Sequence, residues 1–535
     1  MIGFFTQRRL VAGGLLAAAL LTIRPAAAQE VTITDLPASY YRGLRAVDGQ
    51  FYYLLLPQEK TYDIFHLEIY GRDLQKKGST ELKLDRDWAL GDVRVVGDNT
   101  VFYFFAGKEG LLLTLNAAGQ KVKEVRFPAT GLYGSITAIV PAGNGDFYLT
   151  YPIDAGKSGY AVARYGPDLT ARWQKEYAPE KGKYRVQFFQ ANAAHVYAVA
   201  DYSKAGMEVV VLDGTTGAEQ AHKDVQAVGS SLTVGLASLD AAGHLLLAGA
   251  YRDQQKTAFV TVSSNKPGVA SPPPPGGLFL MGVAPDGNQE FMGRMTYADD
   301  LAGKLNTHSS MQSFTVGDWP TVKMHSLLPR PGGGYTLLGE TTKTFGFTDF
   351  QYDAAGGVRA PGPNGAAGPG PLRSEILDFV VLDLSAQGKL EKLRRIPKPF
   401  KTYTDGSNGG NGTAEFKTKL AYAYRFLSPR DPAQLPDVVF LNWHDNLLYV
   451  NSLKPATDVR DNIFTRLYLD QVAVPTGPDR GERTERGVPS LINSPAPGEM
   501  LYDEIFPHAP GKFVYSHYEP SKASLHLQVL DLPAK

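Results

Sequence analysis

The sequence predicts an all-β protein, a single β-propeller of about eight four-stranded blades. Three observations favour this fold class. Short segments rich in β-forming residues recur at nearly constant spacing, a second pair of strands joined by a tight turn follows them within each unit, and the 535 residues include 56 glycines and 36 prolines, which indicate many turns. Units of about 45 to 50 residues with roughly four short strands are typical of propeller blades.

The repeat is visible in its strand cores. Five cores begin near Gln50, Asn99, Gly145, Ala194 and Gly243, at intervals of 49, 46, 49 and 49 residues. Three more begin near Gly333, Asp437 and Lys512, after intervals of 90, 104 and 75 residues that read as one unit plus insertions. The count is eight units, or seven if the irregular seventh and eighth units merge. Continuous apolar runs such as VFYFF indicate strands that are covered on both faces, as inner blade strands are.

A tight turn joins the second pair of strands in a unit. In MEVVVLDGTTGAEQAHKDV, residues 207–225, the segment DGTTG fills the slot that NAAGQ, PDG and LSAQG fill in other units. Asn, Asp and Gly tolerate positive φ and bond their own backbone, so this slot predicts a hairpin turn. A competing hypothesis is a phosphatase nucleophile like that of the haloacid dehalogenase family, but Val211 stands where that pattern requires a second aspartate.

The repeat unit resembles those of exported bacterial β-propeller proteins, many of which have no assigned activity. LDGTTG is also similar to the turn of quinoprotein-type propeller repeats. Those repeats usually carry a tryptophan after the turn, where this sequence has residues such as His222 and Lys223. The resemblance therefore implies the architecture, and we expect no cofactor, although a quinone-dependent enzyme stays a third functional possibility.

The two ends of the chain predict how the ring closes. The segment LHLQVLDL near the C-terminus supplies the third strand of the last unit. Residues 30–35, EVTITD, alternate as a strand does and would add the outermost one. Such a join leaves no open edge on the last blade.

Five long insertions are expected on one face of the ring. With the strands of a unit named a to d from the centre outward, the b-to-c loops and the d-to-a connections emerge together because neighbouring strands are antiparallel. The insertions are residues 253–276 and 341–376 in b-to-c loops, and residues 297–325, 398–418 and 475–500 in d-to-a connections. Loops of this length are uncommon unless they bind something or are disordered.

A few side chains on that face are candidates for binding a ligand. They are Trp443, His444 and Asp445 after a b-type strand, Asp318, Trp319 and His325 in or beside the insertion before the sixth unit, and Tyr403 and Asp405 in the insertion before the seventh. An aromatic ring beside polar groups can stack on a sugar or anchor a peptide. No catalytic residue is assigned, and the ten histidines show no metal-ligand spacing, so we expect no metal site.

The N-terminus predicts export. Residues 1–28 contain Arg8-Arg9, an apolar segment of about 14 residues and the triplet Ala26-Ala27-Ala28, which is the order of a secretory signal peptide. We therefore expect cleavage after Ala28 and a mature propeller domain over residues 29–535. The arginine pair also resembles a twin-arginine signal, so the export route stays open. No later segment is long and apolar enough to span a membrane, and the mature protein is expected to be soluble and periplasmic or extracellular.

Composition narrows the function classes. The absence of cysteine excludes disulfides, thiolate metal sites and a cysteine nucleophile. The 54 basic and 54 acidic residues balance, and loss of the signal removes three arginines and no acid, so nothing favours nucleic acid or an anionic membrane as partner. We expect a monomer that acts through its loop-rich face as a binding or scaffold module for an unknown protein, peptide or glycan. The alternative is an extracellular glycan hydrolase or lyase that uses carboxylates from several blades.

Overall fold

The computed structural model describes the chain from residue 30 to residue 531 with gaps. The described residues are 30–36, 44–57, 64–84, 88–130, 136–154, 158–179, 184–202, 206–227, 229–253, 276–301, 304–305, 321–330, 333–346, 351–352, 358–359, 372–396, 402–405, 422–427, 437–442, 447–452, 465–467, 473–475, 503–519 and 522–531. No helix among them is long and apolar enough to cross a membrane. The predicted signal peptide lies outside the described residues and stays a prediction.

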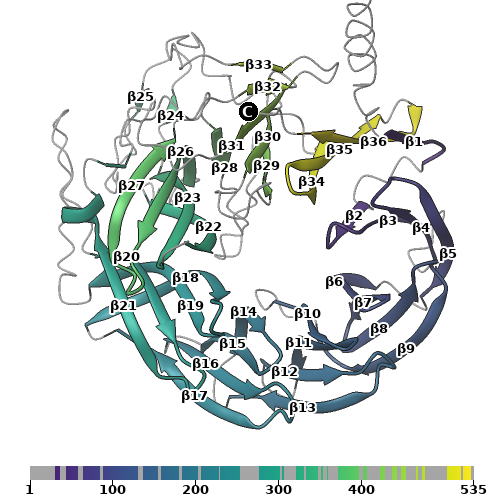
Figure 1. Cartoon of the computed structure of the whole chain (residues 1–535), viewed down its shortest axis with the longest axis horizontal. Coiled ribbons are helices and arrows are strands. Elements are labelled where there is room, and N and C mark those ends of the chain that lie inside the picture. Colours follow the sequence, from purple (N-terminus) through teal and green to yellow (C-terminus); the bar gives the residue numbers. More distant parts are fainter. Residues whose placement is uncertain are drawn as a thin grey trace, which may run out of the picture.

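The described strands form eight large antiparallel sheets arranged as a ring (Figure 1). We call them blades 1 to 8 in chain order and give their strands from the centre outward. Blade 1 contains β2 (Leu44–Val47), β3 (Phe51–Pro57), β4 (Ile64–Gly71) and β5 (Lys76–Lys83), and blade 2 contains β6 (Ala89–Val96), β7 (Asn99–Ala106), β8 (Glu109–Asn116) and β9 (Lys121–Pro128). Blade 3 contains β10 (Ala138–Gly143), β11 (Asp146–Asp154), β12 (Ser158–Tyr165) and β13 (Ala171–Tyr177), and blade 4 contains β14 (Tyr184–Ala191), β15 (His195–Tyr202), β16 (Gly206–Asp213) and β17 (Glu219–Val225).

Blades 5 to 8 follow the same order with additions. Blade 5 contains β18 (Ser230–Leu239), β19 (Leu245–Asp253), β20 (Gly276–Val283) and β21 (Gln289–Thr296), after which a short π-helix, η2, spans Tyr297–Leu301. Blade 6 contains β22 (Thr321–Pro329), β23 (Tyr335–Gly346), β26 (Leu372–Leu384) and β27 (Leu390–Ile396), and β28 (Thr402–Asp405) also pairs with β26. Blade 7 has five strands, β29 (Tyr422–Leu427), β30 (Asp437–Asn442), β31 (Leu447–Ser452), β32 (Thr465–Leu467) and β33 (Ala473–Pro475). Blade 8 contains β34 (Asp503–Ala509), β35 (Lys512–Glu519), β36 (Ser524–Asp531) and β1 (Glu30–Ile33), and a separate hairpin pairs β24 (Gln351–Tyr352) with β25 (Val358–Arg359).

The predicted fold class is confirmed, and the eight-blade count holds over the seven-blade alternative. Each of the eight strand cores found by spacing is the second strand of one blade, from β3 in blade 1 to β35 in blade 8. Blades 7 and 8 are separate sheets. The N-terminal strand β1 pairs antiparallel with β36 from Glu30 opposite Gln528 to Ile33 opposite Leu525, so it closes blade 8 from the outside as expected.

Three of the segments predicted as insertions contain strands. β23 and β26 remain paired as far as Gly346 and Leu372, so both strands are longer than those of the other blades. The ends of both strands lie in the segment that was predicted to be a loop. β28, from the next predicted insertion, pairs with the first residues of β26 and widens this extension. In the insertion predicted over residues 297–325, η2 occupies the start and β22 begins at Thr321.

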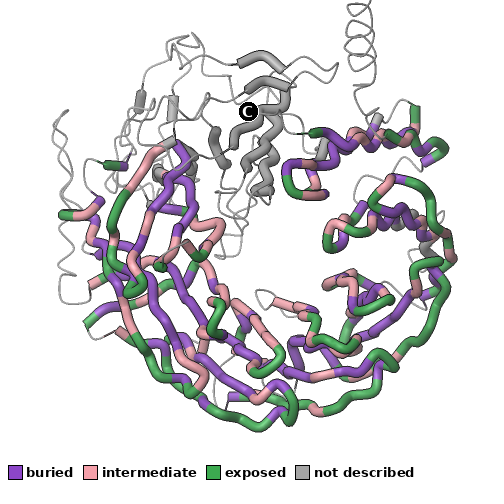
Figure 2. Tube along the Cα trace, viewed as in Figure 1, coloured by how far each residue is buried: buried purple, intermediate pink, exposed green. Residues whose placement is uncertain are grey.

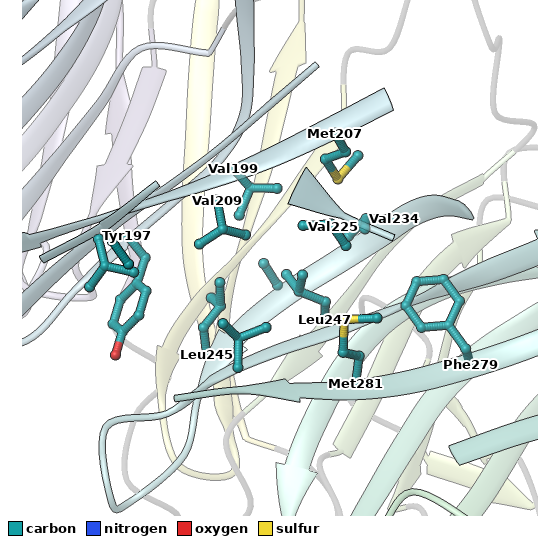
Figure 3. Close-up of a cluster of buried hydrophobic side chains, with 14 of the residues drawn as sticks. Tyr197, Val199, Met207, Val209, Val225, Val234, Leu245, Leu247, Phe279 and Met281 are labelled. Carbon is teal, nitrogen blue, oxygen red and sulfur yellow. The ribbon is translucent and has the colours of Figure 1, made fainter. Parts of the chain in front are cut away.

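The core lies between the blades rather than at one centre. The middle strands of a blade, such as β8 and β20, are buried almost throughout, whereas the innermost strand β6 and the outermost strand β9 are largely exposed or half-buried, and Figure 2 shows buried strands between the two edges of the blades. Figure 3 shows one cluster between blades 4 and 5, in which Val209 of β16 packs with Leu247 of β19 and Met281 of β20. Apolar burial between neighbouring sheets is therefore what stabilises the ring.

The DGTTG segment is a turn, as its slot predicts, and it binds the preceding blade. The Asp213 carboxylate accepts hydrogen bonds from the backbone N–H groups of Thr215 (3.0 Å) and Thr216 (2.7 Å), which fixes the turn. The carbonyl oxygen of Gly214 accepts hydrogen bonds from three side chains of blade 3: Tyr148 Oη at 3.1 Å, Arg164 Nη1 at 2.9 Å and Trp173 Nε1 at 3.3 Å. Arg164 is itself held by Asp146, with Nη2 to Oδ2 at 2.8 Å.

One residue of each c-to-d turn in blades 1 to 6 adopts a left-handed conformation and faces the preceding blade. These residues are Leu74, Gly119, Leu169, Gly217, Gly287 and Gly388. At Gly217, with φ of +70°, an added Cβ would lie 2.6 Å from Cδ2 of Trp173, so only glycine permits both the backbone and the contact. The two leucines instead insert their side chains, and Leu169 is buried with residues of blade 2.

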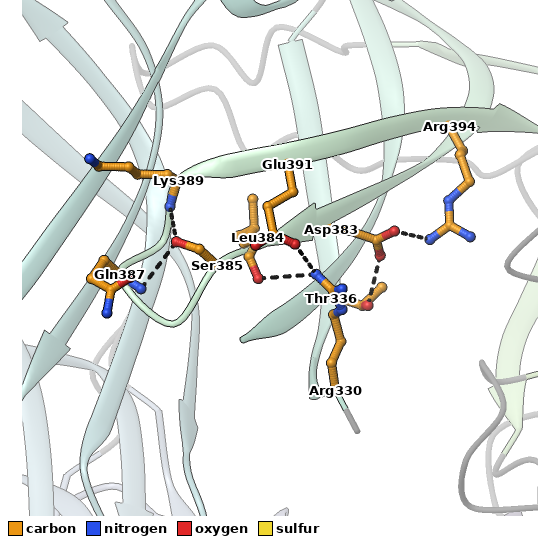
Figure 4. Close-up of polar contacts among 9 residues, drawn as sticks. All are labelled: Arg330, Thr336, Asp383, Leu384, Ser385, Gln387, Lys389, Glu391 and Arg394. Carbon is orange, nitrogen blue, oxygen red and sulfur yellow. Dashed lines mark hydrogen bonds and ion pairs between the residues drawn. The ribbon is translucent and has the colours of Figure 1, made fainter. Parts of the chain in front are cut away.

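Polar contacts support the corresponding turn of blade 6 (Figure 4). Ser385 Oγ accepts hydrogen bonds from the backbone N–H groups of Gln387 and Lys389, both at 3.2 Å. Beside the turn, Arg394 Nη2 lies 2.5 Å from Oδ2 of Asp383, whose other oxygen accepts a bond of 3.0 Å from Thr336 Oγ1. Contacts within blade 6 thus fix the conformation of the turn that packs against blade 5.

A buried hydrogen bond joins blade 8 to blade 1. The Tyr52 hydroxyl and His508 Nδ1 are 2.8 Å apart, and the two rings stack with centroids 6.2 Å apart. Burial lowers the pKa of His508, the positive charges of Arg72 and Lys512 lower it further, and Asp531 partly opposes them. The neutral imidazole is therefore the form that suits this junction.

We expect Gly217→Ala to destabilise the protein by about 2 to 4 kcal/mol, because it adds a clash with Trp173 to the cost of a left-handed alanine. The matched control is Gly107→Ala, which has a similar φ of +58° but no atom within 4 Å of the added Cβ. The control should lose only about 1 to 2 kcal/mol. Urea unfolding measures both, and equal losses would show that the turn does not bear on Trp173.

We expect the free energy of unfolding to fall as the pH is lowered through about 6.5, the value for an unfolded histidine. The folded chain binds a proton at His508 less readily than the unfolded chain, so unfolding takes up protons below that pH. His508→Asn keeps an acceptor for Tyr52 and should remove part of this loss. His66→Asn, at a side chain that is 41% exposed, should retain it. Thermal unfolding between pH 5 and pH 8 separates the cases.

Candidate binding face

The face predicted to carry the insertions is defined by strand direction. Strands b and d of every blade end on it, and we call it the loop face. On the opposite face, a-to-b and c-to-d connections in blades 1 to 6 have two to five residues, as in the c-to-d turn of residues 117–120. The strands on either side of the long connections have their adjoining ends on the loop face, as β19 and β20 do at Asp253 and Gly276.

One predicted insertion departs from this arrangement at one end. β33 is a fifth strand antiparallel to β32, so the chain leaves blade 7 on the opposite face and must return to the loop face to enter β34. Residues 476–502 make this connection and lie outside the described residues. The extra strand was not predicted because it has three residues and no distinctive pattern.

Most of the candidate residues lie outside what the structure describes. Trp443, His444 and Asp445 fall between β30 and β31, which is a b-to-c position of blade 7, and their placement is not described. Asp318 and Trp319 are likewise outside the described residues. Tyr403 and Asp405 stand in β28, opposite Glu375 and Arg373 of β26, and their side chains are not described. Their role in binding stays a prediction.

His325 is the one candidate whose side chain is described. It is the extra residue of a β-bulge in β22, between Met324 and Ser326, where the register with β23 shifts. Its Nε2 lies 2.7 Å from Oε2 of Glu340, and the two side chains are only 9% and 0% exposed. The bulge thus turns a histidine toward a fully buried carboxylate near the loop-face end of blade 6.

The same position in blade 4 repeats this arrangement with other residues. Gln187 is the bulge residue of β14, between Val186 and Phe188, and its side chain bonds Asp201 of β15. Burial raises the pKa of Asp201, while Arg185 and the bond from Gln187 lower it. Sequence reasoning did not find this pair, because a bulge has no signature in spacing alone.

An arginine covers a tyrosine ring on the loop face of blade 5. The guanidinium carbon of Arg294 lies 5.1 Å from the centroid of the Tyr251 ring. Burial raises the pKa of this tyrosine most, Asp253, Asp300 and Asp299 raise it further, and Arg294 lowers it. Here the chain itself supplies the cation for an aromatic ring surrounded by carboxylates.

A group of tyrosines lies where blades 3 and 4 meet, and we call it the tyrosine patch. It consists of Tyr160, Tyr177, Tyr184, Tyr202, Glu208, Glu219 and His222. Tyr184 and Tyr202 are opposite one another at the loop-face ends of β14 and β15, with ring centroids 5.1 Å apart. From there the patch runs outward over Tyr160 to Tyr177, whose rings stack at 5.1 Å. None of these residues was predicted, since they come from six different strands.

Two carboxylates face these rings. Glu208 Oε2 lies 2.8 Å from Nε2 of His222, and the Glu208 carboxylate also accepts a hydrogen bond from the Tyr184 hydroxyl. Glu219 Oε2 accepts a bond of 2.8 Å from the Tyr177 hydroxyl. Burial and these carboxylates raise the pKa of Tyr177 and Tyr184, so both phenols stay neutral donors.

Other features of the described residues are less suited to a ligand. A cavity of about 140 Å³ lies between blades 4 and 5, lined by Val209, Lys223, Val225, Met281 and Asn288 among others. That is well below the roughly 300 Å³ at which ligand pockets begin. No group of three or more His, Asp or Glu in the described part of the chain is arranged to hold a metal ion.

Comparison with known proteins adds solved structures of similar fold. No family model and no curated protein matches the sequence. BamB from Moraxella catarrhalis is similar over 94% of this chain and 98% of its own, with 9% identity and a TM-score of 0.35. The Dos1 propeller is similar over 90% and 89%, with 8% identity and a TM-score of 0.39. The dihydro-heme d1 dehydrogenase NirN is similar over 83% and 78%, with 12% identity and a TM-score of 0.35.

We expect Glu340→Ala to cost about 3 kcal/mol of stability, because it removes a buried carboxylate that His325 contacts. Glu340→Gln, which still accepts a hydrogen bond, should cost less. Glu124→Ala, at an exposed carboxylate paired with Lys121, should change stability by less than about 1 kcal/mol. Chemical unfolding measures the free energy of unfolding of the three variants. Equal losses of stability for Glu340→Ala and Glu124→Ala would contradict a structural role for the buried pair.

Proposed function

We propose that this chain is an exported, soluble and monomeric β-propeller that acts as a binding or scaffold module for a peptide, protein or glycan through its loop face. The observation that carries the proposal is the tyrosine patch. It places four aromatic rings and two carboxylates together at a blade junction that begins on that face. Aromatic side chains with a polar tip are the groups most enriched in binding surfaces.

The state of the carboxylates favours binding over catalysis. Glu208 and Glu219 each accept hydrogen bonds from protein side chains, and Glu340 is fully buried against His325. A glycosidase needs two carboxyl groups about 5 to 10 Å apart that face the scissile bond across an open site. Carboxylates engaged in this way hold aromatic rings and imidazoles in position, which is the task of a binding surface.

The position of the closing strand supports export. Cleavage after Ala28 would leave one residue, Gln29, before β1 begins at Glu30. The mature chain would thus start with the strand that completes blade 8. A location in the periplasm or outside the cell is part of the proposal.

The test is recovery of a partner from cell-envelope extract on immobilised mature protein, residues 29–535, identified by mass spectrometry. We expect deletion of residues 257–275, on the loop face, to reduce recovery of that partner while the thermal midpoint stays nearly unchanged. The matched control is an alanine substitution on the opposite face, at Lys389 in the c-to-d turn of blade 6, which should recover the partner fully. Release of reducing sugars from a polysaccharide panel, or recovery that is indifferent to every change on the loop face, would contradict the proposal.

A further inference from the structure

The ring is closed by strands from the two ends of the chain. Among the described strands, β1 pairs with β36 alone, and β36 is the last strand of blade 8 in chain order. Thr32 Oγ1 of β1 and His526 Nδ1 of β36 are 2.9 Å apart, although the two residues are 494 positions apart in the sequence. Blade 8 is therefore complete only when both ends of the chain have come together.

The folded chain holds β1 and the residues after it firmly. Ile33 is 8% exposed and Leu36 is 4% exposed, and both pack in the cluster between blades 8 and 1 with Tyr52 and Leu527. The Leu36 N–H donates a hydrogen bond of 2.9 Å to the Ala523 carbonyl. Release of β1 would expose both apolar side chains and the edge of β36, so β1 stays bound in most folded molecules.

The predicted cleavage site lies directly before this strand. Hydrolysis of the bond between Ala28 and Gln29 adds water and leaves a carboxylate on Ala28 and an amino group on Gln29. Only Gln29 separates that bond from Glu30, which is paired with Gln528 of β36. β36 continues past Gln528 to Asp531, so blade 8 extends beyond the point at which β1 begins.

Pairing of β1 and cleavage beside it compete for the same backbone. A peptidase binds the residues around the bond that it cleaves in an extended form, and a backbone already paired in a sheet is closed to it. A folded precursor would be cleaved only while β1 is detached, at a rate that follows the small detached fraction. In a chain that crosses a membrane unfolded from its N-terminal end, β1 arrives first and β36 last, so β1 has no partner when the cleavage site reaches the peptidase.

We propose that the signal peptide is removed before β1 pairs with β36, so that the ring closes only in the mature chain. While the signal is attached, β1 stays with it at the membrane surface, and blade 8 lacks its outermost strand. Hydrolysis after Ala28 releases β1, which then covers the edge of β36. This inference rests on the proposed export and adds the order of two events, cleavage first and closure second.

The test compares cleavage of the full precursor, residues 1–535, by a purified signal peptidase in detergent. Precursor diluted from urea directly into the peptidase should be cleaved roughly tenfold faster, or more, than precursor that was first allowed to refold. Mass spectrometry of the product checks that the new N-terminus is Gln29, and circular dichroism shows which preparations are folded. Equal cleavage rates for the two preparations would overturn the proposal, and rapid cleavage of the refolded precursor is what export of a folded chain by a twin-arginine route requires.

Variants of the precursor assign the protection to β1. A spacer of about eight glycine and serine residues after Gln29, which spans up to roughly 25 Å, should let the refolded precursor be cleaved as rapidly as the unfolded one. Ile33→Ala combined with Leu36→Ala loosens β1 and should also speed cleavage of the refolded precursor. The matched control is Val122→Ala, at a side chain that is 52% exposed on the outer strand of blade 2, which should leave the rate unchanged.

The outcomes separate this inference from the proposed function. A spacer that leaves the refolded precursor as resistant as before would overturn the inference, because the protection would then not come from β1. If the unfolded and refolded precursors are cleaved alike before Gln29, the proposed export stands and the inference alone fails. If no precursor is cleaved there in any state, the proposed export fails and the inference fails with it.

Discussion

The seating of each c-to-d turn on the blade before it is the constraint on which the ring depends. A propeller blade buries its faces only against its neighbours, so the angle between two blades must be fixed. In this molecule the turn does that: the Gly214 carbonyl takes three donors from blade 3, and Gly217 lies against Trp173 without room for a side chain. Where the left-handed residue is a leucine, it enters the neighbouring core instead. Two chemical solutions thus serve one geometric requirement.

This requirement also explains where the chain can lengthen. Turns that contact the preceding blade cannot lengthen without losing that contact, and in blades 1 to 6 the connections of that face have two to five residues. Long connections of blades 5 and 6, residues 254–275 and 347–371, instead join strands whose adjoining ends lie on the loop face. The turns that hold neighbouring blades together are therefore on one face, and the strands that flank the long connections adjoin the other. If the long connections carry the function, the strand directions indicate on which face it is found, and no catalytic motif is needed to locate it.

The sequence predicted the parts of the fold that repeat. All eight second strands, the hairpin slot at Asp213 and the closing strand β1 follow from spacing and turn chemistry, which are local properties. The contact of the DGTTG turn with Trp173 was not predicted, because Trp173 belongs to the preceding blade, 41 residues before the Gly214 carbonyl to which it donates a hydrogen bond. The tyrosine patch was missed for the same reason, since Tyr160 and Tyr202 meet only through Tyr184. Contacts between blades depend on how each sheet twists and how the sheets stack, and the sequence of a single segment determines neither.

Two tyrosines of the patch, Tyr160 and Tyr177, occupy a position that is apolar core at the next junction of the ring. Register places Tyr177 at the outer-strand end opposite Tyr160, and the same pairing in blade 4 joins Val225 to Met207. Both residues of that second pair are buried and apolar, and they pack between blades 4 and 5. At the junction of blades 3 and 4 the same pairing joins two tyrosines, and the hydroxyl of Tyr177 donates a hydrogen bond to Glu219. This junction therefore keeps the close packing of large side chains and adds a polar contact at its outer end. The apolar pair at the next junction shows that burial alone can close the space between two blades, so the polar contact is a feature of this junction and not of the repeat.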